Sequence, residues 1–434
     1  MENNQVNVGI LGLGTVGTGV ARILLEQAEL LKTRSGLAFN LAAIAELDWG
    51  KERDLDLSGV KCTTNVNELL EDPAIDVIVE TIGGYEPAFS FVSQALNQRK
   101  QVVTANKALI ATKGRDLFKL ARKNGVNLKF EASVGGGIPI IKGLREGLVA
   151  NRILSIYGIL NGTSNYILTR MHQDELEFAE ALQEAQAKGF AEADPTLDVG
   201  GGDAAHKLTI LSSIATSGFV RCEDILVEGI TEITKLDIQF AKNFGYTIKL
   251  LAVFHNREDG IDVRVHPTLI PNSHLLAAVS RELNAIFVKG DFVGDTMFYG
   301  PGAGERPTAS AIVSDILDLS RDLRLGEHCC DRSSQAINPE KTIPIVPVNS
   351  IRNRFYLRFF TLDEPGILSK ISGTLGEHGI SIASMVQLET HETDHYVPIV
   401  LLTHEASEEA MNRALIEISK FDFVKENYLK LRLF

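Results

Sequence analysis

The segment from residue 189 to 208 holds the densest cluster of side chains suited to chemistry. Its carboxylates include Glu192, Asp198 and Asp203. Lys207 follows Asp203 by four residues, so that on a helix the two would share one face. The apolar residues after Lys207 predict that this helix is buried along much of its surface. A buried lysine beside carboxylates is expensive unless it serves a function, so the cluster favours a functional site over a surface ion pair.

A second lysine, Lys107, follows the strand-like run 101–104. In an open sheet of parallel strands, ligands collect at the carboxyl ends of the strands. A lysine at that edge can face a nicotinamide ring and a substrate. A solvated surface lysine is the commoner alternative for this residue type, and position alone leaves the two interpretations evenly balanced.

Glu131 is followed by a glycine-rich run, residues 134–138, that joins a carboxylate to exposed backbone carbonyls. Hard cations take oxygen ligands from both side chains and backbone, so the pattern fits a cation site. It fits equally well a glycine loop that approaches a cofactor closely.

The spacing Gly12-x-Gly14-x-x-Gly17 lies between an apolar strand and a helical pattern, which indicates a dinucleotide site. The first glycine would form the tight turn, the second would let the backbone approach a pyrophosphate, and the third would let the helix pack on the strand. The predicted cofactor site includes Thr15 and Val16, because the helix N-terminus supplies amide donors to phosphates. A glycine-rich turn without a ligand is the weaker alternative.

The end of the second predicted strand, residues 45–48, bears on the choice between NAD and NADP. Glu46 or Asp48 would hydrogen-bond a ribose hydroxyl and repel a 2′-phosphate. Lys51 or Arg53 would instead accept the phosphate. We predict that NAD is used as well as NADP or better.

Together these motifs resemble those of the homoserine dehydrogenase family over nearly the whole chain. The matching stretches are residues 12–17, 104–107, 131–138, 161–168, 192–208 and 300–304. The chief departure is Leu47, where NADP-preferring members often carry an arginine. The C-terminal segment is similar to an ACT domain, an amino-acid-binding regulatory module, with residues 363–368 as its first turn. Because the cofactor motif stands at the start of the chain, we expect the monofunctional type without a preceding kinase segment.

The resemblance implies NAD(P)-dependent interconversion of L-homoserine and L-aspartate 4-semialdehyde, in the biosynthesis of threonine, methionine and isoleucine. It implies that Lys207 and Lys107 flank the reacting oxygen, with Lys107 also at the cofactor. It further implies that Glu192 binds the substrate ammonium group, that Asp203 engages the substrate and that Asp198 supports them. The chemistry agrees, because hydride transfer to an aldehyde develops negative charge on oxygen, which a cationic donor stabilises.

By the same resemblance, Gly304 belongs to the cofactor site, and a structural sodium ion is expected at the domain junction. Its ligands would be Glu131 and the backbone carbonyls of Val134, Gly136 and Ile138.

The elements that must position these residues follow two patterns. Up to about residue 135, strands expected at 6–11, 41–45, 77–81, 101–104 and, shorter, 129–131 alternate with helices at 20–25, 88–97 and 114–124. That alternation predicts a Rossmann-like, doubly wound parallel sheet. Beyond it, an α+β domain is expected from strands at 153–159, 261–269 and 285–289 and helices at 164–173, 177–188 and 310–322.

The C-terminal segment has the order β-α-β-β-α-β, which is the ferredoxin-like arrangement. Its strands are expected at 354–361, 380–387, 396–403 and 424–432, and its helices at 367–378 and 407–419. The 434 residues are therefore divided into an NAD(P)-binding domain 1–135, a catalytic and dimerisation domain 136–330, a linker 331–353 and an ACT domain 354–434.

The C-terminal module also predicts regulation and assembly. Backbone amides of Gly366 and Ile367 are expected to take the carboxylate of an amino-acid effector, with threonine as the candidate by resemblance. A module that serves only to join subunits is the alternative. A spare sheet edge and two helices on one face suit side-by-side pairing with a second copy, so we expect a homodimer or homotetramer.

Composition excludes several classes of function. The net charge of −13 and the lack of a dense Lys/Arg cluster argue against a nucleic-acid partner. No apolar run approaches about 20 residues and no signal-peptide pattern opens the chain, so we expect a cytoplasmic protein without a membrane segment. The four cysteines, Cys62, Cys222, Cys329 and Cys330, lack a C-x-x-C spacing and are too few for a disulfide framework.

Two rival functions stay open at this point. One is another amino-acid dehydrogenase on the same layout, acting on a different semialdehyde or imine. The other is a non-catalytic sensor that binds a nucleotide and an amino acid. Intact Lys107, Glu192, Asp203 and Lys207 disfavour the sensor, because a chain that had lost its catalysis would be expected to lose such costly charges.

Overall fold

The computed structural model describes residues 5–324, 337–387, 396–425 and 428–434. The chain forms two compact units. The first unit comprises Met1–Leu160, Ala205–Ile225 and Leu283–Ile343, and the second comprises Asn161–Ala204, Leu226–Glu282 and Pro344–Phe434. Each unit is built from three separate stretches of chain, whereas the domains expected from the sequence are continuous. The expected domain boundaries therefore stay a prediction.

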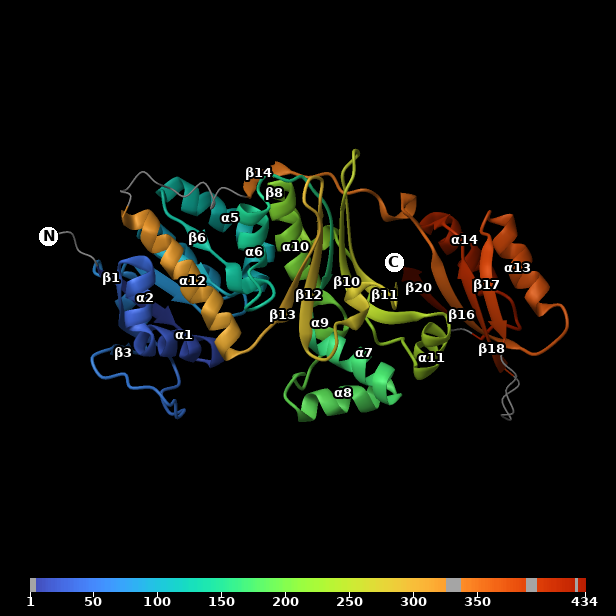
Figure 1. The fold of residues 1–434 in the computed structure, drawn as a ribbon, viewed down its shortest axis with the longest axis horizontal. Coiled ribbons are helices and arrows are strands. Elements are labelled where there is room, and N and C mark those ends of the chain that lie inside the picture. Colours follow the sequence, from blue (N-terminus) through green and yellow to red (C-terminus); the bar gives the residue numbers. More distant parts are fainter. Residues whose placement is uncertain (1–4, 325–336, 388–395, 426–427) are drawn as a thin grey trace. The chain divides into compact units, whose positions relative to one another are not determined.

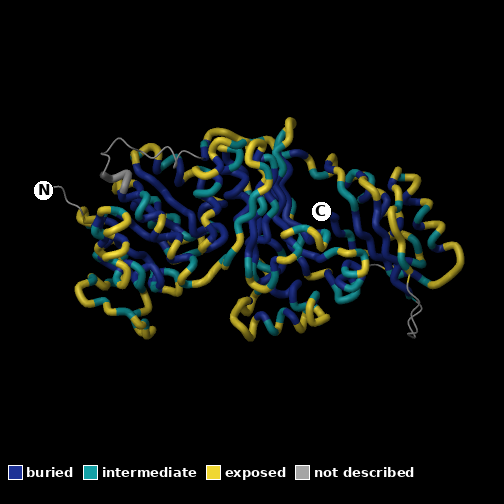
Figure 2. Tube along the Cα trace, in the orientation of Figure 1, coloured by how far each residue is buried: buried dark blue, intermediate teal, exposed yellow. Residues whose placement is uncertain are grey.

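The first unit contains a six-stranded parallel sheet in the order β3-β2-β1-β4-β5-β6, which confirms the Rossmann-like expectation. Its strands are rich in valine, isoleucine and leucine because both faces of such a sheet are covered. They are β1 (Gln5–Leu11), β2 (Ala38–Ala45), β3 (Lys61–Thr63), β4 (Val77–Glu80), β5 (Gln101–Thr104) and β6 (Leu128–Lys129). The helices between them are α1 (Thr15–Glu26), α2 (Ala28–Ser35), α3 (Asn67–Leu70), α4 (Ala88–Asn97) and α5 (Lys107–Asn124). Strands β1, β4, β5 and β6 are largely buried, whereas β3, at the edge of the sheet, and α2 are largely exposed (Figure 2).

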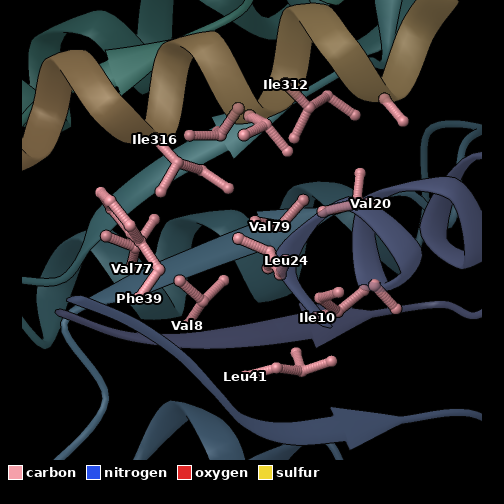
Figure 3. Packing of buried hydrophobic residues seen from close by; sticks show 14 of the residues in the cluster. Val8, Ile10, Val20, Leu24, Phe39, Leu41, Val77, Val79, Ile312 and Ile316 are labelled. Carbon is pink, nitrogen blue, oxygen red and sulfur yellow. The ribbon is translucent and has the colours of Figure 1, made fainter. Parts of the chain in front are cut away.

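Helix α12 (Glu305–Arg324) covers one face of this sheet beside α1, although it lies far along the chain (Figure 1). Ile312 and Ile316 of α12 share one buried apolar cluster with Val20 of α1 and Val79 of β4 (Figure 3). The sequence predicts this helix but assigns it to the α+β region. Periodicity shows that a helix has an apolar face, not which sheet that face covers.

The rest of the first unit contains three adjacent antiparallel strands, several helical segments and a short strand pair. The three strands have the order β13-β12-β7. These strands are β7 (Ile153–Ile159), β12 (Leu283–Gly290) and β13 (Gly294–Pro301). The remaining elements are η1 (Glu131–Ser133), α6 (Ile140–Lys142), η2 (Gly143–Gly147), α10 (Gly202–Thr216), β8 (Gly218–Phe219), η3 (Cys222–Asp224) and β14 (Asn338–Thr342). Part of the expected linker is thus ordered, since β14 pairs with β8.

The second unit is built on a long antiparallel hairpin of β10 (Tyr246–Asn256) and β11 (Ile261–Pro271). Strand β10 is absent from the sequence expectation because its continuous apolar run, residues 250–254, lacks the alternation that marks a half-buried strand. The other elements of this part are α7 (Gly162–Asp174), α8 (Phe178–Ala187), α9 (Thr196–Val199), β9 (Leu226–Val227), α11 (Lys235–Asn243), η4 (Leu275–Ala278) and η5 (Val348–Ser350).

The C-terminal module of the second unit has the strand order β20-β16-β18-β17, as expected of a ferredoxin-like fold. Its elements are β15 (Arg352–Asn353), β16 (Phe355–Leu362), α13 (Ile367–Glu377), β17 (Ile382–Gln387), β18 (Tyr396–Thr403), β19 (Ala406–Ser407), α14 (Glu408–Ile418) and β20 (Leu429–Leu433). Strand β20 also pairs in parallel with β11. Among the described residues, the spare sheet edge is therefore that of β17 alone.

None of the helices in the described ranges combines the length and apolarity needed to cross a bilayer.

Candidate functional site

The glycine motif forms a tight turn between β1 and α1, as predicted. Gly12 has a φ of +92°, which favours glycine. A Cβ on Gly17 would lie 2.1 Å from the carbonyl oxygen of Gly12, so the third glycine is required for close packing of helix and strand. No atom lies within 4 Å of a Cβ built on Gly14, which leaves the backbone open to a pyrophosphate.

A cavity of about 540 Å³ lies beside this turn within the first unit. It brings together Gly12, Gly14 and Glu46, three of the predicted cofactor residues. The other lining residues are Ala45, Leu47, Lys51, Arg53, Thr64, Asn65, Val66, Asn67, Thr81, Ile82, Pro87 and Phe91. Residues 64–67 and 81–82 were not predicted, yet they follow β3 and β4 at the carboxyl edge where ligands collect.

The other predicted cofactor residues do not line this cavity. Thr15, Val16 and Gly17 are the first residues of α1. Gly304, with a φ of +113°, is exposed between β13 and α12. Lys107 is half-buried and is the first residue of α5.

Glu46 is fixed as an anion at the end of β2. Its carboxylate accepts hydrogen bonds from the amides of Leu13 (2.6 Å) and Asp48 (2.9 Å). Burial alone would raise the pKa of Glu46, but these bonds and the nearby Arg53 lower the pKa below its usual range. The Arg53 guanidinium itself donates to the carbonyl of Leu13 at 2.8 Å. The side chain of Leu47, by contrast, is 85% exposed.

The turn before Lys107 is held by a chain of hydrogen bonds. The Thr104 hydroxyl donates to the buried carboxylate of Glu80 and accepts from the amide of Asn106. Asn106 caps α5 by accepting from the amide of Leu109 at 3.1 Å. These bonds fix the backbone from which Lys107 projects.

Lys207 lies on α10 and is only 8% exposed. Its ammonium group donates to the carbonyl of Leu160 at 2.6 Å. The same carbonyl accepts from the side-chain amide of Asn284 at 2.9 Å. The predicted burial of this lysine is thus confirmed, and Asn284 is a neighbour that the sequence did not indicate.

Two of the predicted carboxylates are brought together by Asn161. Its side-chain amide donates to Asp198 (2.7 Å) and to Asp203 (2.9 Å), and its oxygen caps α7 by accepting from the amide of Ser164. Asp203 is 1% exposed. Glu192 does not join this pair; its side chain is exposed in the loop after α8. The signal for Asn161 was its place in the motif at 161–168, although no role was assigned to it.

Glu131 is buried at the start of η1. Its two carboxylate oxygens accept from the amides of Ile141 (2.9 Å) and Lys142 (2.8 Å), and its own amide donates to Asp315. Burial and the neighbouring Asp315 raise the pKa of Glu131 to about 7, and burial raises the pKa of Asp315 to about 6. Asp315 was not predicted, since it comes from α12.

The three carbonyls predicted to share a cation with Glu131 belong to a tight turn. Gly136 has a φ of +55°, and a Cβ there would lie 2.7 Å from the backbone of Gly302. The amide of Ile138 donates to the carbonyl of Gly135, which closes the turn after Val134. No cluster of three or more His, Cys, Asp or Glu residues suited to a metal occurs in the described part of the chain. A site of one carboxylate and several backbone carbonyls differs from such a cluster, because most of its ligands come from the backbone.

The predicted effector turn precedes α13. Gly366 is exposed and adopts a φ of +95° at the N-cap of the helix. The side chain of Ile367 is buried, and its amide donates weakly, at 3.4 Å, to the carbonyl of Glu364. Of the cysteines, Cys62 and Cys222 are free thiols whose pKa is raised by burial, and Cys329 and Cys330 lie outside the described residues.

Three family models match the chain. Residues 139–317 match homoserine dehydrogenase, residues 12–131 match the homoserine dehydrogenase NAD-binding domain, and residues 355–419 match the ACT domain.

Relatives match the chain over nearly its full length. The homoserine dehydrogenase of Pseudomonas aeruginosa is 43% identical, covering 99% of this chain and 98% of its own. That of Bacillus subtilis is 41% identical, covering 97% and 96%. The crystal structure of a homoserine dehydrogenase from Thiobacillus denitrificans has a TM-score of 0.93 at 44% identity, covering 99% and 98%. A hyperthermophilic archaeal homoserine dehydrogenase in complex with NADPH has a TM-score of 0.60 at 27% identity, covering 73% and 98%.

Proposed function

Because the chain belongs to the homoserine dehydrogenase family, we propose roles for its site residues in the reaction of that family. The chain is an NAD(P)-dependent oxidoreductase that acts on a CH–OH group, interconverting L-homoserine and L-aspartate 4-semialdehyde. A bound nicotinamide accepts or supplies the hydride. The protein must therefore orient the substrate and manage one proton and the charge on the reacting oxygen.

Lys207 is proposed to donate the proton to the reacting oxygen when the aldehyde is reduced, with Lys107 beside it. A cationic donor aimed at a developing alkoxide lowers the barrier. The hydrogen bond to the carbonyl of Leu160 supports this role, because it fixes the ammonium group of Lys207 in one direction. The capped N-terminus of α5 similarly gives Lys107 a fixed backbone.

Asp203 and Glu192 are proposed to bind the amino-acid substrate, with Asp198 in support. Glu192 would bind the ammonium group of the substrate. The observation that carries this proposal is Asn161, whose single amide holds both Asp198 and Asp203 while capping α7. A hydrogen-bonded pair of carboxylates, of which Asp203 is buried and Asp198 half-buried, offers a ready site for an ammonium group. Glu192 is exposed, so its contribution depends on how far the bound substrate covers it.

The cofactor is NAD or NADP, and we propose that NAD is used at least as well. Glu46 is held as an anion at the end of β2 and Leu47 offers no charge, which favours a free ribose hydroxyl. Lys51 and Arg53 also line the cavity and would oppose this preference if they bound a 2′-phosphate. The archaeal relative noted above binds NADPH.

A sodium ion is proposed at Glu131 and the carbonyls of Val134, Gly136 and Ile138. The buried carboxylate and the tight turn give a set of oxygen donors that suits a hard cation. With sodium in place of choline at equal ionic strength, the melting temperature should rise in the wild type and not in Glu131→Gln. An equal change of melting temperature in both proteins would show that no sodium ion binds at Glu131.

Assembly and regulation are also proposals. We expect a cytoplasmic homodimer or homotetramer, and an amino-acid effector, threonine, at Gly366 and Ile367. The ACT domain match and the exposed turn at Gly366 support the effector.

The carboxylate site is tested by Asp203→Asn. The Michaelis constant for homoserine should rise by about tenfold or more while that for the cofactor changes little. Asp194→Asn is the matched control, because Asp194 is exposed in the same segment and asparagine keeps the acceptor that binds Thr196. Equal constants in the two variants would refute the assignment.

A further inference from the structure

A short segment of the second unit, residues 226–230, lies against the loop that joins Asp198 to Asp203. We name it the strap. It begins with β9, which pairs with β11, and the amide of Glu228 donates to the carbonyl of Val265 at 2.8 Å. One side of the strap is thus bound to the central hairpin.

The other side of the strap packs closely against the loop. The amide of Ile230 donates to the carbonyl of Val199 at 2.8 Å. A Cβ on Gly229 would lie 2.5 Å from the carbonyl oxygen of Val199 and 2.8 Å from the Cα of Gly200. Because Asp198 and Asp203 flank this loop, its position determines where their carboxylates stand.

The strap is also tied to the C-terminal module by an ion pair. Arg432 of β20 donates to both carboxylate oxygens of Glu228, at 2.6 and 3.0 Å. The Arg432 side chain is 2% exposed and also pairs with the buried carboxylate of Glu408 from α14. Neutralising Glu228 would leave Arg432 paired with Glu408, so the arginine would not become an uncompensated buried charge.

We propose that Glu228 is a positioning residue for substrate binding. Through its ion pair with Arg432 it fixes the strap, and the strap fixes the loop between Asp198 and Asp203. The C-terminal module is thereby a structural part of the substrate site and not only an attached sensor. This inference rests on the proposed roles of Asp198 and Asp203.

The expected effect falls on homoserine more than on turnover or cofactor. The strap touches the loop that carries the carboxylates, whereas the dinucleotide cavity is built in the first unit from residues 12–91. A shift of the loop therefore weakens binding of the substrate and leaves cofactor binding alone. A general loss of folding would change all the constants together.

The test is Glu228→Gln in the full-length chain, with Glu228→Asp to restore the charge. The Michaelis constant for homoserine should rise about five- to thirtyfold in Glu228→Gln and less in Glu228→Asp, with kcat changed by less than about threefold. Arg432→Lys keeps a cation for Glu408 but loses the two-pronged contact, and should act in the same direction. Glu417→Gln is the matched control, because Glu417 pairs with His378 inside the module and away from the strap.

Two results contradict this expectation: a Michaelis constant for homoserine in Glu228→Gln equal to that in Glu417→Gln, or one that rises in step with the Michaelis constant for the cofactor. Either result would overturn the inference. If Asp203→Asn raises the constant for homoserine and Glu228→Gln does not, only the inference fails. If Asp203→Asn has no effect, the proposed substrate site fails first.

Discussion

At the scale of single residues, Lys207 gives the clearest prediction. In Lys207→Met the apolar chain fills most of the lysine's volume, but the cationic proton donor is lost. Turnover should fall by about 10²–10⁴-fold with little change in cofactor affinity. Lys188→Met is the control, because Lys188 pairs with Glu184 at the surface. Unchanged kcat at saturating homoserine, measured by cofactor absorbance, would show that another group donates the proton.

Local motifs predicted the glycine turn but not the partners that hold the charged groups. Gly17 could be assigned because its close contact is with the carbonyl oxygen of Gly12, five residues earlier. Asn161 could not, since the two carboxylates it holds lie 37 and 42 residues further along the chain. Burial of Lys207 followed from the apolar residues after it. Glu192, predicted to bind the substrate, is exposed.

At the scale of elements, most strands were predicted closely, including the fully buried strand β5, but β10 was not. The strands at Gln101–Thr104 and Ile153–Ile159 have the predicted bounds. Strand β10, which was not predicted, places Lys249 in the interior of the second unit. The ammonium group of Lys249 donates to the side chain of Asn165 on α7 and to the carbonyl of Val279. It therefore joins β10, α7 and the segment after η4.

The stability of these joined elements should depend on pH through Lys249. Burial lowers its pKa from 10.5 to about 8, so the folded protein holds this proton less tightly than the unfolded chain does. The free-energy cost of burying the Lys249 ammonium group is present in full below about pH 8 and decreases as the pH rises toward 10.5. The stability of the wild type relative to Lys249→Met should therefore increase between pH 7 and 10, by up to roughly 3 kcal/mol.

Urea unfolding of both proteins at pH 7, 8, 9 and 10 measures that difference, and groups other than Lys249 cancel in the comparison. Parallel pH profiles for the two proteins would mean that Lys249 keeps its ordinary affinity for the proton.

At the scale of the whole molecule, the order of elements predicted the C-terminal module but not its attachment. Strand β20 of the module pairs in parallel with β11. Asp237, at the start of α11, accepts hydrogen bonds from Tyr356 and Arg358 of β16. Such contacts join segments that are distant in sequence, and no periodicity encodes them. Deleting the module would expose the edge of β11 and leave Asp237 without these partners, so its role is best tested in the full-length chain.

Regulation through the module predicts an effect of Gly366→Ala. A φ of +95° strains any residue with a Cβ, so the turn before α13 should shift. The concentration of threonine that halves activity should rise by about tenfold, with homoserine kinetics little changed. Gly373→Ala is the matched control, since Gly373 lies within α13 and its Cβ would meet no atom within 4 Å. Equal sensitivity of both variants, or inhibition purely competitive with homoserine, would place any effect at the active site.

The most direct test of the account is the steady-state oxidation of L-homoserine by the unmodified chain, followed by the absorbance of the reduced cofactor. We expect cofactor reduction that depends on homoserine, with kcat/KM for NAD at least equal to that for NADP because Glu46 is fixed at the end of β2. Absence of cofactor reduction with both nucleotides at saturating homoserine would contradict the account.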